Sequence, residues 1–103
     1  MHTIPLIEIA DDDPVVHESL GLYLDAENFQ HVSAKNGEEA LEIFKEKEPD
    51  LLILDLMMPK MSGTDVCREI RKTSMVPIIM LTAKGEEIDR ILGLELGAVS
   101  YTH

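Results

Sequence analysis

The chain alternates short apolar runs with longer segments in which apolar and polar positions follow a helical period. Nearly every position within a run is hydrophobic, as in a parallel sheet that is covered on both faces. The segments between the runs space their hydrophobic residues three or four positions apart, which predicts amphipathic helices. The predicted strands are 4–10, 29–34, 51–54, 76–81 and 98–102, and the predicted helices are 14–27, 37–47, 64–72 and 86–96. We therefore expect a doubly wound parallel α/β sheet of five strands, with helices on both faces.

Polar residues, proline and glycine mark the ends of these helices. Asp13 and Asn36 stand where helix N-caps are expected, Pro14 fits a first helical position, and Gly97 fits a C-cap. Cys67 falls on the inward side of its helix and is predicted to be an inert core residue. The helical periodicity of the first helix is carried by Val15, Val16, Leu20, Tyr23 and Leu24.

Carboxylates follow two of the predicted strands. The run 51–54 ends in Asp55, followed by a loop that contains Pro59 and Gly63, and the run 4–10 ends in the acidic cluster 11–13. In open α/β sheets, ligands bind outside the carboxyl ends of the strands. Three or four carboxylates at that edge would form a site for a hard cation, with one carboxylate left over for chemistry. This arrangement favours phosphoryl chemistry.

Composition restricts the remaining possibilities. The chain has 103 residues, enough for one small domain, and no apolar run approaches the length of a membrane span. It starts without an export signal, and its only cysteine cannot form an internal disulfide, so we expect a cytoplasmic protein. The net charge is −11, which makes direct contact between this domain and nucleic acid unfavourable.

Four motifs at successive strand ends resemble those of the receiver domains of two-component response regulators. These are the pair Asp11-Asp12, the loop from Asp55 to Gly63, the pair Thr82-Ala83, and Gly97-Ala98 followed by Tyr101. The stretch 81–98 is especially similar to the OmpR/PhoB class, whose members carry a winged-helix DNA-binding domain after the receiver. The resemblance implies a flavodoxin-like sheet with strand order 2-1-3-4-5.

The resemblance also implies a phosphoacceptor and a metal site. Asp55 corresponds to the carboxylate nucleophile that accepts a phosphoryl group from the histidine of a sensor kinase. Asp12, Asp55 and the backbone carbonyl of Met57 correspond to ligands of Mg²⁺, and Asp11 would act through water. The domain would catalyse only its own phosphorylation and dephosphorylation, so we do not expect an enzyme in the usual sense.

Further residues would carry the switch. Thr82 corresponds to the hydroxyl that contacts the phosphoryl group, and Ala83 would leave the attack line open and offer its backbone N–H. Tyr101 corresponds to the aromatic switch residue, which turns inward when Thr82 is drawn toward the phosphate. The face of the fourth helix and fifth strand would then control homodimerisation and output, here transcription through a DNA-binding domain outside this chain.

The chain departs from the family pattern in three places. It stops at His103, one residue before the position of the family's lysine, and we expect residues 1–103 to be a receiver domain without the end of its fifth strand and its fifth helix. We expect that form to self-associate or to be marginally stable. Val99-Ser100 stands where acidic residues are common, and Glu8 lies in an otherwise apolar strand, where a buried carboxylate would need a partner or a raised pKa.

Two other functions fit parts of the pattern. A phosphohydrolase of the haloacid-dehalogenase type would use an aspartate nucleophile, but needs a second aspartate two residues later, where this chain has Met57. A flavodoxin-like mononucleotide binder would need a phosphate loop after the first strand, where the acidic cluster would repel a phosphate. Both are disfavoured. Asp13 is expected to act only as a helix cap, and the methionines at 57, 58 and 61 to cover the site. The histidines at 2, 17, 31 and 103 have no metal-ligand spacing and are predicted to lie at the surface.

Overall fold

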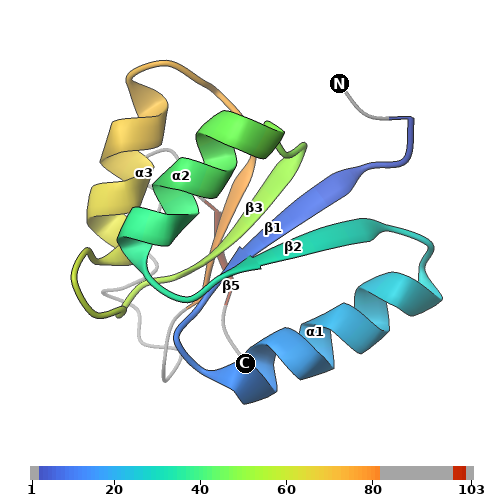
Figure 1. Ribbon diagram of the computed structural model, residues 1–103. Coiled ribbons are helices and arrows are strands. Elements are labelled where there is room, and N and C mark those ends of the chain that lie inside the picture. The colour runs from blue at the N-terminus through green and yellow to red at the C-terminus, as the bar shows by residue number, and fades with distance from the viewer. Residues whose placement is uncertain (1–2, 82–98, 102–103) are drawn as a thin grey trace.

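The computed structural model describes residues 3–81 and 99–101 and contains an open, fully parallel sheet with helices on both faces (Figure 1). The elements are β1 (Leu6–Ala10), α1 (Pro14–Ala26), β2 (Gln30–Ala34), α2 (Gly37–Lys47), β3 (Leu51–Asp55), α3 (Gly63–Arg71), β4 (Ile78–Leu81) and β5 (Val99–Tyr101). The strand order is β2-β1-β3-β4-β5. The predicted fold class and strand order are confirmed. The helix predicted at 86–96 lies outside the described residues.

The sheet separates two layers of apolar side chains. Among the described helices, α1 covers one face, and α2 and α3 lie side by side on the other (Figure 1). The larger core lies under α2 and α3 and includes Leu52, Leu54, Val66, Cys67 and Ile70. The smaller core lies under α1 and consists of Ile7, Ile9, Leu24 and Ile53, with partly buried neighbours. Since successive strand residues point to opposite faces, the apolar strands predicted from sequence supply both layers.

Two predicted strands begin later than expected. Residues 4 and 5 precede β1, with Ile4 exposed, and residues 76 and 77 precede β4. In both cases a proline ends the excluded segment, and proline has no N–H to donate to a sheet ladder. Pro77 still contributes its carbonyl, which accepts a hydrogen bond from the Leu52 N–H at 3.0 Å. The other helix and strand ends within the described residues match the predicted ends or differ from them by one residue.

Helix α1 buries only some of the apolar residues that give it helical periodicity. Leu24 is buried and Leu20 is partly buried, but Val15 and Tyr23 are 65% and 63% exposed. Val15 and Tyr23 therefore contribute to the helical periodicity of the sequence but not to the core. A helix that packs only against one face of a sheet buries a narrow strip of its surface, and residues at the edges of that strip stay exposed to solvent.

The two predicted helix caps, Asp13 and Asn36, are confirmed. Asp13 Oδ1 accepts a hydrogen bond from the Val15 N–H at 2.9 Å, with Pro14 in the first turn. Asn36 Oδ1 accepts a hydrogen bond from the Glu39 N–H, also at 2.9 Å. These contacts satisfy N–H groups that have no partner within the helix. Within the described part of the chain, no helix is long and apolar enough to cross a membrane.

Candidate functional site

The acidic residues predicted to form the site converge at one edge of the sheet. Strands β1 and β3 are parallel neighbours with Ala10 opposite Leu54, so Asp11 and Asp55 occupy equivalent places at their carboxyl ends. Oxygen atoms of Asp11, Asp12 and Asp55 all lie within 4.8 Å of one another. Asp11 is buried, Asp55 is half-buried and Asp12 is exposed. The cluster is therefore open to solvent on the side of Asp12.

Backbone N–H groups orient two of the carboxylates. The Asp13 N–H donates to Asp11 Oδ1 at 2.8 Å, and the Met57 N–H donates to Asp55 Oδ1 at 3.2 Å. Asp11 is itself fixed to β2, because its N–H donates to the Ala34 carbonyl at 3.0 Å. The site is thus held by the loop after each strand as well as by the strands.

The electrostatics of the cluster disfavour full ionisation. The pKa of Asp55 is raised to about 6, chiefly by burial and also by the neighbouring carboxylates of Asp11 and Asp12, while the hydrogen bond from the Met57 N–H lowers it. The pKa of Asp11 is also raised, chiefly by burial. Like charges held together in a partly desolvated place destabilise the ionised form of each. A cation at this edge would relieve that cost.

A hollow of about 510 Å³ opens beside the carboxylates. Its lining residues come from the acidic cluster, from the loop after β3 and from the start of α3: Asp12, Leu56, Met57, Met58, Pro59, Ser62 and Thr64. Met57 is exposed and Met58 is buried against the larger core. The expectation that the methionines cover the site fits these two. Met61 also packs against the larger core but does not line the hollow.

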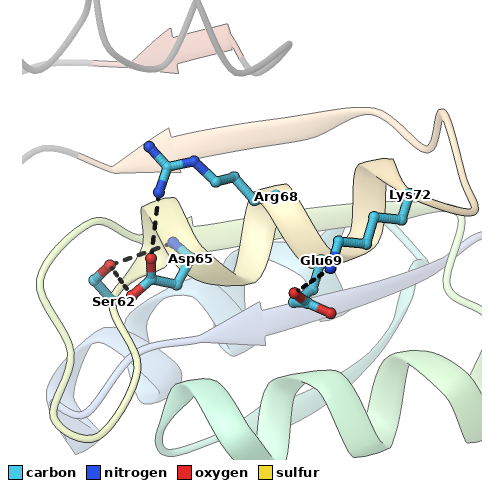
Figure 2. A network of polar contacts seen from close by, with 5 residues as sticks. All are labelled: Ser62, Asp65, Arg68, Glu69 and Lys72. Carbon is cyan, nitrogen blue, oxygen red and sulfur yellow. Dashed lines mark hydrogen bonds and ion pairs between the residues drawn. The ribbon is translucent and has the colours of Figure 1, made fainter.

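Helix α3 begins where the loop returns to the sheet. Gly63 donates its N–H to the Leu56 carbonyl at 2.9 Å, and a Cβ on Gly63 would lie only 2.2 Å from the carbonyl oxygen of Asp55. Ser62 caps the helix: its Oγ accepts a hydrogen bond from the Asp65 N–H at 3.3 Å and donates one to Asp65 Oδ2 at 3.1 Å (Figure 2). Only glycine permits the close approach of residue 63 to the Asp55 carbonyl, so the start of α3 helps to set the position of the Asp55 backbone.

His17 is a neighbour of the site that sequence reasoning missed. Its Nε2 lies 2.7 Å from the carbonyl oxygen of Asp11, so Nε2 carries the proton and donates. The ring is half-buried, and Nδ1 is buried without a hydrogen-bond partner among the described residues. His31 is also half-buried, with Nε2 3.0 Å from Asp25 Oδ1. The prediction of surface histidines was therefore wrong at both positions. Because His17 lies one turn into the helix after β1, its spacing from Asp11 could have indicated the contact.

The remaining predicted site residues are not described. Thr82 and Ala83 lie outside the described residues, as does Gly97, and of Tyr101 only the backbone in β5 is described. β5 pairs with β4 so that Tyr101 stands opposite Leu81, the residue before Thr82. The predicted roles of these residues stay predictions.

An open parallel sheet with a carboxylate cluster at the carboxyl ends of the neighbouring strands β1 and β3 places this chain among the doubly wound α/β domains, whose sites lie at that edge. The sequence model of the response regulator receiver domain matches residues 7–103, which is most of this chain. The chain therefore belongs to the response regulator receiver domain family, and it is the receiver domain of a response regulator. This confirms the resemblance proposed from the four motifs and gives no support to the haloacid-dehalogenase alternative.

Individual relatives agree with the family. A probable transcriptional regulator, ycf27, of Guillardia theta is 50% identical over 101 residues, which cover 98% of this chain and 40% of the relative. A putative response regulator from Chloroflexus aurantiacus is 37% identical with a TM-score of 0.90, covering 96% of this chain and 84% of that one. A chain in the co-crystal of the Saccharomyces cerevisiae phosphotransfer protein Ypd1 with the Ssk1 receiver domain is 27% identical with a TM-score of 0.88. The match covers 96% of this chain and 78% of that one. This chain spans about two fifths of the length of the curated relatives that it matches.

Proposed function

We propose that Asp55 is the phosphoacceptor of this receiver domain. The observation that carries the proposal is the position of Asp55 at the end of the central strand β3, half-buried beside two other carboxylates and oriented by the Met57 N–H. A carboxylate whose pKa is raised to about 6 is still mostly ionised at neutral pH and is more basic than an ordinary aspartate. These properties suit an oxygen nucleophile.

The proposed reaction is a phosphoryl transfer from a sensor histidine kinase. An oxygen of Asp55 forms a bond to phosphorus as the bond between phosphorus and the kinase imidazole nitrogen breaks, and that nitrogen regains a proton. The product is an acyl phosphate on Asp55. Acetyl phosphate can replace the kinase, in which case the bond from phosphorus to the acetate oxygen breaks and acetate leaves. The hollow lined by Asp12 and Met57 provides space for such a donor.

We further propose that Asp12, Asp55 and the backbone carbonyl of Met57 hold Mg²⁺, with Asp11 acting through water. The donor set fits this ion, because hard carboxylate oxygens converge there and their ionisation is unfavourable without a counter-charge. When bound, Mg²⁺ would neutralise charge on the transferring phosphoryl group. The chain's own part is to hold Asp11 and Asp55 in place through the Asp13 and Met57 N–H groups.

Thr82, Ala83 and Tyr101 complete the proposed switch. Thr82 would donate its hydroxyl to the phosphoryl group, Ala83 would contribute its backbone N–H, and Tyr101 would turn inward in response. These roles rest on the family resemblance. The pairing of Leu81 with Tyr101 supports them, because it brings the ends of β4 and β5 together.

The proposed partner is a histidine kinase or a phosphotransfer protein. Support comes from the Ssk1 receiver domain, whose structure was solved together with the phosphotransfer protein Ypd1. Helix α1, which follows the acidic cluster directly, offers further support, because Val15, Leu22 and Tyr23 are exposed on it. Exposed apolar side chains of this kind are common at sites of protein interaction.

The proposed output is control of transcription in the cytoplasm. The ycf27 relatives are named as probable transcriptional regulators and are much longer than this chain, which supports a DNA-binding domain beyond the receiver. The net charge of −11 favours no direct nucleic-acid contact by residues 1–103. We propose that residues 1–103 belong to one receiver domain, and that the fourth-helix and fifth-strand face mediates homodimerisation or self-association.

Phosphorylation can be tested by intact-mass measurement. Incubation with acetyl phosphate and Mg²⁺ should add the mass of one phosphoryl group, and chelation of Mg²⁺ should prevent it. The adduct should be removed by hydroxylamine, which cleaves acyl phosphates and leaves phosphoserine intact. An adduct that survives hydroxylamine would contradict an aspartyl phosphate.

Mg²⁺ alone should stabilise the domain. An ion that binds only the folded chain at about one hundred times its Kd adds about 2.7 kcal/mol. For a domain of this size that corresponds to a rise of roughly 10 °C or more in the thermal midpoint. The midpoint is measured by circular dichroism during a Mg²⁺ titration, with Asp12→Ala as the variant and Asp13→Asn as the control. An equal rise in Asp12→Ala would show that the ion binds elsewhere.

A further inference from the structure

The first residue of α2 lies in unusually close contact with the loop that follows Asp55. Gly37 is buried, and a Cβ built on it would lie 2.4 Å from the carbonyl oxygen of Met61 and 2.5 Å from the Met61 Cβ. Side-chain carbons do not approach backbone atoms so closely. Any residue other than glycine at position 37 would therefore require either α2 or the loop to move.

The loop is under local strain at the point of contact. Lys60 has a φ of 69°, a left-handed conformation that is rarely adopted by residues other than glycine. The Met61 N–H donates to the Pro59 carbonyl at 2.8 Å, two residues back, so Lys60 is the centre of a tight γ-turn. Such a turn persists only when its surroundings hold it. The described surroundings include Gly37 and also Glu38, whose Oε1 lies 3.5 Å from Lys60 Nζ in an exposed ion pair.

The start of α2 is too well anchored to retreat. Asn36 caps it through the Glu39 N–H at 2.9 Å, and Glu39 Oε1 in turn accepts from the Lys35 N–H at 2.9 Å. These reciprocal contacts resemble a capping box and join the helix to the end of β2. A collision between a side chain at position 37 and Met61 would therefore displace the loop.

Displacement of the loop would reach the phosphoacceptor. The loop is closed by the hydrogen bond from Gly63 to Leu56, so a shift at Met61 cannot be absorbed at its far end. Its near end carries Met57, whose N–H holds Asp55 Oδ1. The loop thus links position 37 to the orientation of the Asp55 carboxylate.

We propose that Gly37 is a positioning residue for the phosphoacceptor site, which rests on the proposed function of Asp55. By admitting the backbone of Met61 against α2, it holds the strained turn at Lys60 and keeps Met57 in place beside Asp55. It touches neither the phosphoryl group nor the metal, and it acts through the loop.

The variant Gly37→Ala tests this, with Gly21→Ala as the matched control. Gly21 lies in α1 on the other face of the sheet, where an added Cβ would meet only the edge of the His31 ring at 3.1 Å. Gly37→Ala should weaken Mg²⁺ binding and slow labelling by acetyl phosphate by roughly tenfold to a hundredfold, which is typical when support of a metal site is lost. Gly21→Ala should leave both unchanged.

Two measurements separate this role from ordinary destabilisation. The first is the Mg²⁺ concentration that gives half of the thermal stabilisation, without acetyl phosphate. The second is the labelling rate at saturating Mg²⁺, at a temperature where circular dichroism shows each variant to be folded. A lower midpoint with unchanged Mg²⁺ affinity and labelling rate would overturn the proposal. A wild-type chain that is not labelled would contradict the proposed function of Asp55, but a loss of Mg²⁺ affinity in Gly37→Ala would still support the positioning role.

Asn36→Ala provides the test if Gly37→Ala does not fold. It removes the cap and loosens the start of α2, at a typical cost of about 1 kcal/mol, and adds no atom near Met61. A reduced Mg²⁺ affinity in folded Asn36→Ala, by threefold or more, would support the proposal. Unchanged Mg²⁺ affinity and labelling rate would overturn it.

Discussion

Replacement of Asp55 by asparagine is expected to abolish phosphorylation while making the folded domain more stable at neutral pH. Asparagine keeps the shape of the side chain but lacks the anionic oxygen that would attack phosphorus. It also removes one of three like charges from a half-buried cluster. The pKa of Asp55 is raised to about 6 in the folded state, so ionising this carboxyl group at neutral pH is less favourable in the folded chain than in the unfolded chain. This difference lowers the stability of the wild type at neutral pH, and the asparagine variant, which cannot ionise, does not have it.

The measurement is intact mass after incubation with acetyl phosphate and Mg²⁺, together with the thermal midpoint at pH 7. Asp13→Asn is the matched control, because it makes the same change of charge next to the site while asparagine still caps α1. The control should be labelled at the wild-type rate. A labelled Asp55→Asn chain, with the adduct mapped to another residue, would refute the assignment of Asp55 as the only acceptor.

Replacement of Glu8 by leucine is expected to stabilise the domain by several kcal/mol at neutral pH. Glu8 lies in the middle of β1, in register with Val32 and Leu52, and is 0% exposed. Neither carboxylate oxygen has a hydrogen-bond partner among the described residues. Burial raises its pKa from 4.5 to about 8. It points to the same face as Ala10, where the larger core would accept an apolar side chain.

The gain should depend on pH in a predictable way. Between pH 4.5 and about 8 the folded chain keeps a proton on Glu8 that the unfolded chain has lost. Stability of the wild type therefore falls as pH rises through this window and levels off above it. The advantage of Glu8→Leu should be smallest near pH 4.5, and we expect it to reach roughly 2–4 kcal/mol at pH 8, allowing for relaxation around the buried group.

Urea unfolding at several pH values gives the free energy of unfolding of the wild type and of Glu8→Leu as a function of pH. Both proteins contain the acidic cluster, so subtracting one curve from the other removes its contribution. Glu8→Gln is the second variant. It keeps a buried polar group, so it should gain less than leucine, but it cannot ionise and should remove the same dependence on pH. A parallel pair of wild-type and Glu8→Leu curves from pH 4.5 to 8 would show that Glu8 is not protonated in the fold.

The sequence alone determined the fold class and the identity of the acidic residues. Continuous apolar runs of this length indicate strands that are covered on both faces, and the caps Asp13 and Asn36 mark where the chain turns into helices. The runs place Asp11, Asp12 and Asp55 at the carboxyl ends of parallel strands, and the strand order implied by the family resemblance makes those strands neighbours, so the three carboxylates were expected together. Patterns of this kind depend on local periodicity, which the sequence carries directly.

The tertiary structure decided features that depend on contacts between distant segments. The sequence could suggest that α1 faces the sheet but not that Val15 and Tyr23 stay in solvent, since the width of a buried arc depends on what covers it. Nothing local distinguishes Gly37 from an ordinary helix-start glycine, because its role arises from Met61, far along the chain. The unpartnered state of Glu8 among the described residues likewise follows from how β2, β3 and the helices close around it, and only the packed structure specifies that arrangement.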